Sequence, residues 1–488
     1  MSAHTPFFPS WRAQLAPWSG RLAPTVQTVR AYTLSQLEAS CGAWLPKDLF
    51  PKALKQANSR DRIYTRHRTF WSMLWQGLNP RVSCREVVRQ LQALFDLDGG
   101  PAVSEEDGAC CRAKARLPWC EFPKALVATA QAADRLAPER SLLQGRPIKA
   151  ADGAALTLAD TPKNRQAYPP VQSAPPSFPM LRMVVLFSFL SGAILSAASG
   201  NLHTSELALL YSLFGQLAPK DILLGDRGFG NYVVLALLQH LQLQVDFIGR
   251  ANRQVDGRRR GKRLGKEDWL VVWKKGGTLS PWLPKLLWLA LPMELTVRIV
   301  RGRCYMKGFR VRQVTLVTTL LEAQRYPAHE ILQAYLRRWR LEMCLDDLKT
   351  TLDMEMLRSR TPAMVQKEIY ARLIGHNLIR CVMAQAARAH GVPLERLSFK
   401  GTLDALRHFT QARSQARSKK KAAQLWAKLL QTLAADQVPE RPGRREPRAV
   451  KRKKSKYPRL NAARHKFKDH LKRNTRRKFA RLRRLGLM

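Results

Sequence analysis

The sequence predicts an α/β protein with a mixed sheet at its centre, a helical segment before it and a basic tail after it. Three observations lead to this fold class. Strand-like and helix-like segments alternate between residues 147 and 250, which is typical of a mixed sheet carrying helices on its faces. A β-rich stretch with frequent apolar–polar alternation follows at 250–325. Helical spacing then returns at about 327–352 and 363–388.

The first 145 residues are expected to be mostly helical. Residues 1–29 contain many prolines and polar side chains, so this stretch is expected to be poorly ordered. Further on, Ser83 and Glu86 form a capping box before apolar residues at helical spacing. Basic residues cluster just before it, between 60 and 68. The helical segment 30–145 could therefore recognise nucleic acid, or it could serve only in packing or dimerisation.

The segment from 147 to 250 supplies the predicted sheet. Asp152-Gly153 is interpreted as a tight turn or bulge beside a strand, and the proline-rich residues 163–179 as an irregular loop. The apolar run 183–198, broken by Ser191-Gly192, predicts two buried strands joined by a turn. The remaining elements are expected as a helix at 205–217, a strand at 221–225 that ends at Asp226, a helix at 232–241 and a strand at 245–249.

The stretch at 250–325 is interpreted as a β-rich insertion between the sheet and the later helices. It contains a basic loop at 258–263, and its four tryptophans are expected mainly in the core: Trp269, Trp273, Trp282 and Trp288. Helical spacing appears again at 421–434. From 441 to 488 nearly every residue is Lys, Arg, small or polar. This composition is typical of a disordered arm that binds nucleic acid without sequence specificity.

The charge of the chain points to a polyanionic partner. Lys and Arg number 84 against 36 acidic residues, a formal net charge of +48 over 488 residues, which favours nucleic acid over an ordinary enzyme surface. The eight cysteines show no zinc or disulfide spacing and are interpreted as reduced thiols. Residues 1–19 have no signal-peptide core, and the run 183–198 is too short and polar to span a membrane. We therefore expect a cytoplasmic, nucleoid-associated protein without a membrane partner.

One helical stretch, 335–349, carries the residues most suited to chemistry. Tyr335, Arg338, Glu342 and Lys349 are separated by offsets of three, seven and fourteen residues. On an uninterrupted α-helix they fall within about 60° of one another, on one face. A carboxylate for Mg²⁺ beside cations for phosphate oxygens suits metal-assisted phosphoryl transfer. A solvated helix with ordinary ion pairs is the alternative interpretation of the same spacing.

The pattern Y-x2-R-x3-E-x6-K, with Trp339 and Leu341 before the glutamate, resembles the signature of bacterial insertion-sequence transposases. It is similar to the YREK branch of the DDE transposases, the insertion-sequence-four family. Two further motifs resemble the surroundings of that family's catalytic aspartates, and they occur in the family's order: Ala151-Asp152-Gly153 and the LGDRGFG segment at 224–230. The resemblance covers about 147–388, roughly half of the chain.

The resemblance implies an RNase H-like core interrupted by the β-rich insertion. Asp152, Asp226 and Glu342 would be the catalytic carboxylates and would bind two Mg²⁺ (or Mn²⁺) ions. The implied DNA-binding residues are Tyr335, Arg338 and Lys349, with Arg227 beside the second aspartate. Asp160, also at a strand end, is the alternative to Asp152, and Asp346 could support a ligand. A tryptophan of the insertion could stack on a flipped base, but none is singled out.

The function implied is cut-and-paste transposition: cleavage at the element's ends and joining of the freed 3′-hydroxyl to target DNA. The partners would be double-stranded DNA and a second copy of the chain in a homodimer. Another metal-dependent nuclease of the same fold, or a non-catalytic DNA-binding protein derived from a transposase, are the alternatives. The domain organisation expected is 1–29, 30–145 (helical), 146–250 (core, first part), 251–325 (insertion), 326–400 (core, second part), 401–440 (helical) and 441–488 (basic tail).

Overall fold

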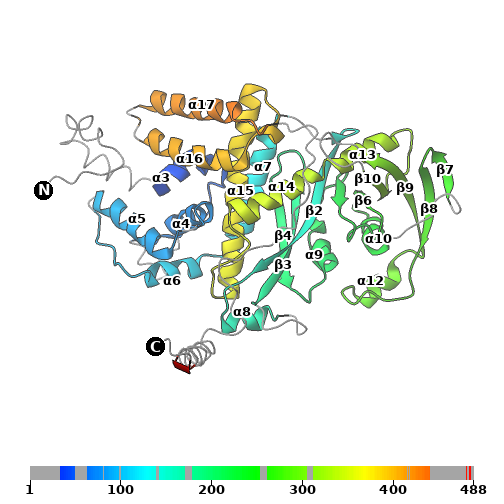
Figure 1. Cartoon of the computed structure of the whole chain (residues 1–488), viewed down its shortest axis with the longest axis horizontal. Helices are drawn as coiled ribbons and strands as arrows, with labels where there is room; N and C mark the ends of the chain where they lie inside the picture. The colour runs from blue at the N-terminus through cyan, green and yellow to red at the C-terminus, as the bar shows by residue number, and fades with distance from the viewer. Residues whose placement is uncertain are drawn as a thin grey trace.

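The computed structural model describes residues 33–49, 63–80, 82–97, 100–138, 142–170, 178–252, 261–304, 312–414, 416, 418–439, 480 and 483–484. The predictions for 1–29, for the first half of the loop 258–263 and for nearly all of the tail 441–488 lie outside these residues. In the described part, helices gather at one end of the molecule and the sheet lies at the other, with the long helix α15 (Pro362–His390) between them (Figure 1).

The strands of the described chain form one ten-stranded mixed sheet in the order β4-β3-β2-β5-β6-β10-β9-β8-β7, with β1 pairing β2 off this path. β5 and β6 run parallel to β2, whereas the other pairs are antiparallel. The mixed α/β prediction is therefore confirmed. The strands are β1 (Leu142–Leu143), β2 (Arg146–Thr157), β3 (Met180–Ser188), β4 (Ile194–Asn201), β5 (Ile222–Gly225), β6 (Asp246–Arg250), β7 (Lys262–Gly265), β8 (Asp268–Lys274), β9 (Glu294–Cys304) and β10 (Arg312–Thr318).

The strands of the expected insertion continue this sheet instead of forming a separate one. β10 pairs with β6, and β9, β8 and β7 follow outward from it. Trp269, Trp273 and Trp288 are buried there, and Trp282 is partly buried. The segment 250–325 is thus β-rich as expected, and its sheet is joined edge to edge with the central strands.

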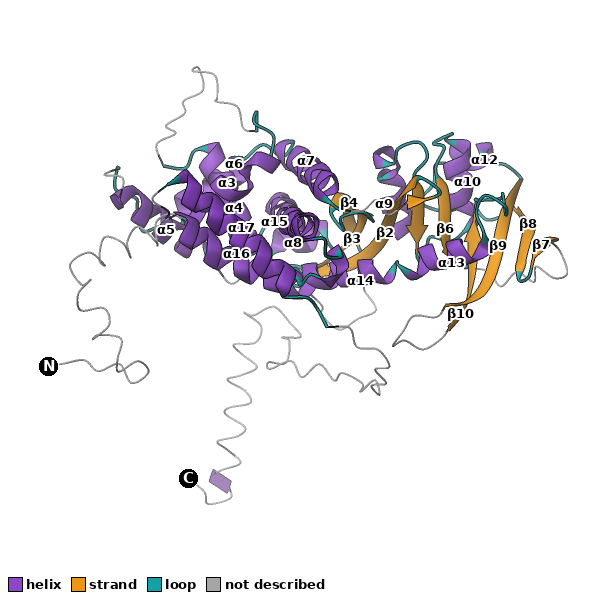
Figure 2. Cartoon of the chain, turned by 90° about the horizontal axis from the view of Figure 1, so that it is seen from above, coloured by secondary structure: helices purple, strands orange, loops and turns teal. Residues whose placement is uncertain are grey.

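Two layers of helices cover the sheet, one on each face. On one side lie α9 (Glu206–Ser212), α10 (Tyr232–His240) and α12 (Lys285–Ala290), which pack in one hydrophobic cluster with that face. On the other side lie α13 (Ala328–Leu336) and α14 (Trp339–Asp346), as Figure 2 shows from above. A second cluster there runs from the opposite face of the sheet through α15 into the N-terminal helices.

Helix α15 is buried along most of its length, because helices surround it on several sides. Thr361 caps its start by accepting a hydrogen bond from the Met364 N–H, and Pro362 occupies the first turn. It ends at Gly391, whose φ of 64° is the left-handed conformation that favours glycine. Its neighbours include α4 (Arg66–Leu78), α7 (Glu121–Leu136), α16 (Phe399–Ser414) and α17 (Lys419–Ala435); α3 (Thr33–Cys41), α5 (Cys84–Leu97) and α6 (Gly108–Arg116) complete the N-terminal group.

The prediction of one uninterrupted helix over 335–349 is wrong. α13 ends at Leu336, a turn at Arg337–Arg338 intervenes, α14 begins at Trp339, and the last residues form the π-helical turn η4 (Asp347–Thr351). The physical reason is that the two halves follow different surfaces. α13 packs against β6 and β9, whereas α14 packs against β2.

Two local predictions in the first part of the sheet also need correction. Asp152-Gly153 is not a turn or bulge, because β2 continues through both residues in regular register with β3. The space at Gly153 is limited, because a Cβ there would lie 3.3 Å from the Glu206 carboxylate. The proline-rich segment contains a short helix, α8 (Pro162–Ala167), capped by the Thr161 side chain. The predicted Ser83 cap is confirmed by a bond from the Glu86 N–H, 3.2 Å long.

Seven cysteines of the described chain are free thiols, as expected. A search of the described helices finds none long and apolar enough to cross a membrane.

Candidate active site

Asp152 lies on β2, and Asp226 directly follows the neighbouring parallel strand β5. β2 and β5 pair from Ile148 with Ile222 to Ala150 with Leu224. If this register is extended by two residues along each strand, Asp152 lies opposite Asp226, which follows the last residue of β5. Each carboxylate also accepts a backbone N–H bond: Asp152 from its neighbour Gly153 at 2.8 Å and Asp226 from Phe229 at 3.1 Å. These bonds limit the rotation of both side chains.

Glu342 approaches this edge from helix α14, and Arg338 connects it to Asp152. The guanidinium Nη2 of Arg338 donates to Oε1 of Glu342 over 2.8 Å, and its Nη1 lies 3.6 Å from Oδ2 of Asp152. The side chains of Arg338 and Asp152 are each 17% exposed, while that of Glu342 is 40% exposed. One guanidinium therefore balances two carboxylates that come from a strand and a helix.

The electrostatics show that the three carboxylates are close enough to affect one another. Burial raises the pKa of Asp152 above its ordinary value, and the charges of Asp226 and Glu342 raise it further. The Gly153 N–H and the Arg338 guanidinium act in the opposite direction, but they do not cancel the increase. A concentration of negative charge in a partly buried site is a cation-binding environment.

Tyr335 lies next to Arg338 at the end of α13. Its ring is buried, and the Arg338 guanidinium carbon lies 5.8 Å from the ring centroid. Burial raises the pKa of the hydroxyl, although the nearby charges of Arg338 and Arg250 lower it. This hydroxyl is buried and has no hydrogen-bond partner of ordinary geometry among the described residues. An unsatisfied buried donor beside a cationic side chain can bind an oxyanion.

Lys349 and Arg227 carry positive charges that are available to bind an anion. Lys349 is partly exposed on the π-helical turn, and Arg227 is exposed in the turn directly after Asp226. Within the described part of the chain neither makes an ion pair with a carboxylate. The structure thus gathers Asp152, Asp226, Glu342, Arg338 and Tyr335 directly, and it puts the two free cations on adjoining segments.

The two competing carboxylates lie outside this cluster. Asp160 is engaged by Arg165, whose Nη2 donates to Oδ2 over 2.9 Å, and it does not contribute to the pKa of Asp152. Asp346 is exposed, and its charge acts on the neighbouring Asp347. The sequence favoured Asp152 for its Asp-Gly context and its position at the opening strand, with Asp160 as the alternative at another strand end.

Arg250, the last residue of β6, was not predicted as a site residue. It is exposed, and its charge lowers the pKa of the Tyr335 hydroxyl. The signal that could have identified it is its position: it ends the strand parallel to and next to β5, as Asp226 does for β5 itself. The ends of parallel strands meet at one edge, where sites of α/β proteins are commonly built.

The donor set suits a hard divalent cation, because all three side chains offer carboxylate oxygens. Within the described residues, however, no three His, Cys, Asp or Glu side chains are close enough together to hold a metal ion. The Arg338 guanidinium lies between Asp152 and Glu342 and contacts both. The residues therefore fit a metal site in their chemistry, with a guanidinium standing between two of the donors.

Comparison with known proteins shows which proteins the chain is similar to. Residues 144–378 match the family model described as "Transposase DDE domain". The chain is 27% identical over 433 residues to the transposase InsG for insertion sequence element IS4 of Escherichia coli (strain K12), which covers 86% of this chain and 93% of that protein. A solved structure, the piggyBac transposase synaptic complex with hairpin DNA, matches with a TM-score of 0.36 and 11% identity over 83% of this chain and 85% of the other.

The chain therefore belongs to the DDE transposases, enzymes of DNA transposition whose domain requires a divalent metal ion. Within them it is an insertion-sequence-four transposase, as the YREK pattern indicated.

Proposed function

We propose that this transposase cuts DNA at the ends of the insertion sequence that encodes it and joins the freed 3′-hydroxyl to target DNA. The observation that carries the proposal is the convergence of Asp152, Asp226 and Glu342, from two strands and a helix, on a site that also holds Arg338. Carboxylates from separate elements are the ligands that phosphoryl-transfer enzymes use for paired metal ions. The resemblance of the chain to insertion-sequence transposases supports the same reaction.

The five strands β4-β3-β2-β5-β6 form the proposed RNase H-like core. Their order supports it, since an antiparallel three-stranded half is joined through β2 to the parallel strands β5 and β6. In this interpretation Asp152 belongs to the central strand and Asp226 to the next one. The strands after β6 then correspond to the insertion.

Asp152, Asp226 and Glu342 would hold two Mg²⁺ or Mn²⁺ ions. When bound, these ions would supply activation of the attacking water or 3′-hydroxyl and stabilisation of the leaving oxygen. The protein's own contribution is to fix the donors: the Gly153 and Phe229 N–H groups orient the two aspartates, and α14 holds the glutamate across from them.

Arg338 has two successive roles in this proposal. Before the metal arrives, it balances the charges of Asp152 and Glu342. With those carboxylates held by metal, the guanidinium would be available to bind the scissile phosphate, for which its fork of N–H donors is well suited. Tyr335 provides a buried hydroxyl on the same side, and Lys349 and Arg227 bind the flanking backbone as free cations.

Double-stranded DNA, as element ends and as target, is the proposed partner, and a homodimer would hold two ends together. The basic tail from 441 to 488 would add sequence-independent affinity, because neutralised phosphates release their counterions. The place of action would be the bacterial nucleoid in the cytoplasm.

The test is an assay that follows cleavage and joining separately. Purified full-length protein is mixed with DNA carrying the source element's own ends, Mg²⁺ and a second, unrelated DNA. Cleavage followed by covalent joining to the second DNA is the expected result. Cleavage without joining would favour a nuclease on the same fold. Salt-sensitive binding without cleavage in Mg²⁺ or Mn²⁺ would favour a non-catalytic DNA-binding protein.

A further inference from the structure

The π-helical turn η4, which carries Lys349, is anchored at its start by an arginine from another helix. Arg380 of α15 donates from Nη2 to the Cys344 sulfur at 2.8 Å. The same nitrogen lies 3.8 Å from Oδ2 of Asp347, the first residue of the turn. The Arg380 side chain is only 10% exposed and that of Asp347 22% exposed, so solvent screens this ion pair weakly.

A second arginine of α15 anchors the other end of the turn. Arg372 donates to the carbonyl oxygens of Leu352, over 2.9 Å, and of Asp353, the two residues that follow η4. Its own charge is balanced by Glu368 at 2.8 Å. Arg372 and Arg380 are eight residues apart, or about two turns of α15, so they present to the same side of the helix.

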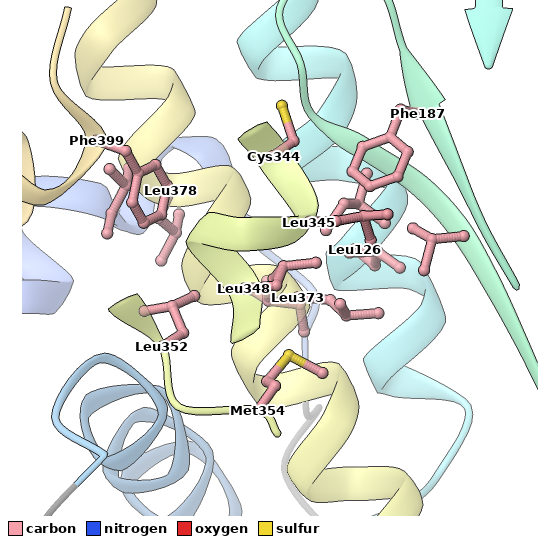
Figure 3. Packing of buried hydrophobic residues seen from close by; sticks show 14 of the residues in the cluster. Leu126, Phe187, Cys344, Leu345, Leu348, Leu352, Met354, Leu373, Leu378 and Phe399 are labelled. Atoms are coloured by element: carbon pink, nitrogen blue, oxygen red, sulfur yellow. The ribbon is translucent and has the colours of Figure 1, made fainter. Parts of the chain in front are cut away.

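A π-turn needs such outside support, because its wide backbone packs less well than an α-helix and occurs mainly as single turns, often at functional sites. Here the widened turn is closed by a bond from the Leu352 N–H to the Asp347 oxygen, 2.9 Å long. Leu345, Leu348 and Leu352 are buried and pack with the leucines of α15 (Figure 3). Lys349 is left on the partly exposed side.

The guanidinium of Arg380 is itself held in place by its surroundings. Its central carbon lies 5.8 Å from the ring centroid of Phe399, and that ring stacks on His376 at 5.0 Å. On another side it packs against Gly192, where a Cβ would lie 3.0 Å from the guanidinium carbon. Gly192 also has a φ of 73°, so both space and backbone conformation require glycine there.

We propose that Arg380 is a positioning residue of the active site, which holds the π-helical turn in register so that Lys349 faces the DNA backbone. This inference rests on the role proposed for Lys349 above. Arg380 touches neither DNA nor metal in this account; it acts only through Asp347, Cys344 and the turn that they begin.

The test is a double-mutant cycle on the full-length protein. Arg380→Met, Lys349→Ala and the double variant are compared by single-turnover cleavage of DNA carrying the element's ends. Arg388→Met is the matched control, since Arg388 lies exposed on the same helix and, among the described residues, bonds only to the Arg135 carbonyl. Thermal melting of each variant checks the fold.

Arg380→Met is expected to slow cleavage about 10- to 100-fold, as a misplaced catalytic group does, while Arg388→Met stays near wild type. On the Lys349→Ala background, Arg380→Met should cost less than about twofold, because its effect passes through Lys349. Equal slowing on both backgrounds would overturn the inference while leaving the role of Lys349 intact. If Lys349→Ala itself cleaved and bound DNA normally, the proposed role of Lys349 would be refuted, and the inference with it.

Asp347→Asn provides a second variant, which places no methionine in the buried surroundings of Arg380. It removes the charge that Arg380 pairs with but keeps the size of the side chain. At pH 7.5, Asp347→Asn should slow cleavage on the wild-type background less than Arg380→Met does. On the Lys349→Ala background, its effect on cleavage should again be smaller than on the wild-type background. A full, additive defect, or no defect at all, would contradict the proposal even if Arg380→Met failed to fold.

Discussion

Arg338 binds Glu342 and Asp152 at once, with its Nη2 2.8 Å from the glutamate Oε1 and its Nη1 3.6 Å from the aspartate Oδ2. The pair of contacts joins helix α14 to strand β2 through two proposed metal ligands. A guanidinium and a divalent ion compete for the same carboxylate oxygens. A metal ion that binds Asp152 and Glu342 would therefore have to displace Arg338 from them.

Replacing Arg338 should have opposite effects on metal binding and on catalysis. Arg338→Met removes a competing positive charge, so Mn²⁺ should bind the DNA-free protein about tenfold more tightly, as measured by electron paramagnetic resonance. Cleavage should nevertheless fall, because the phosphate loses a bidentate donor. Weaker Mn²⁺ binding by the variant would show that Arg338 supports the metal site instead of competing with it.

Asp152 and Asp160 can be distinguished by a matched pair of substitutions. Asp152→Asn should reduce cleavage by at least about 100-fold, because a charged oxygen donor is lost from a metal site. Asp160→Asn removes only a contact with Arg165 and should leave the cleavage rate within about twofold of wild type. Single-turnover rates at saturating Mg²⁺ make the comparison. The reverse ranking would make Asp160 the first ligand.

The partly buried Asp347 should make stability depend on pH. Burial raises its pKa to about 6, Asp346 adds to the increase, and Arg380 from α15 opposes it. Because the folded-state pKa lies above the ordinary value, the group's contribution is fully present below pH 4 and is lost as the pH rises through about 6. Urea unfolding should therefore show the stability of wild type falling relative to Asp347→Asn by up to about 3 kcal/mol between pH 4 and 7. A constant difference over that range would contradict this assignment.

Removing the basic tail should weaken DNA binding without touching the chemistry. A chain ending at residue 440 should bind specific and unrelated DNA more weakly, with a shallower dependence on salt, since fewer phosphates are neutralised. Its cleavage rate at saturating DNA should match that of the full chain. Binding isotherms at several salt concentrations provide the measurement, and loss of cleavage at saturation would give the tail a further role.

Much of the sheet was predictable because its signals are local. The apolar run at 183–198 became β3 and β4 with Gly192 in the turn, and Asp226 follows β5 where the strand pattern ended. The helix over 335–349 was not predicted correctly, because its interruptions come from distant contacts. α13 and α14 follow different strands, and η4 is held by Arg372 and Arg380 from α15.

The difference between local signals and contacts from distant parts of the chain also explains the errors near Asp152. The dipeptide Asp152-Gly153 resembles a turn, but both residues continue β2 in its pairing with β3, and Glu206 of α9 lies close to the glycine. Asp160 looked similar to Asp152 in sequence, and only the pairing of β2 with β5 brings Asp152 level with Asp226. Arg250 gave no motif at all, since its relation to Tyr335 arises from the packing of α13 on β6.

The most direct test of the central claim compares two carboxylates one turn apart. Wild type, Glu342→Gln and Asp346→Asn are assayed for Mg²⁺-dependent cleavage of DNA carrying the element's ends. The account predicts that Glu342→Gln binds this DNA but does not cut it, whereas Asp346→Asn, altered only at an exposed side chain, cuts at the wild-type rate. Cleavage by Glu342→Gln at the wild-type rate would contradict the account, because Glu342 would then have no part in the chemistry.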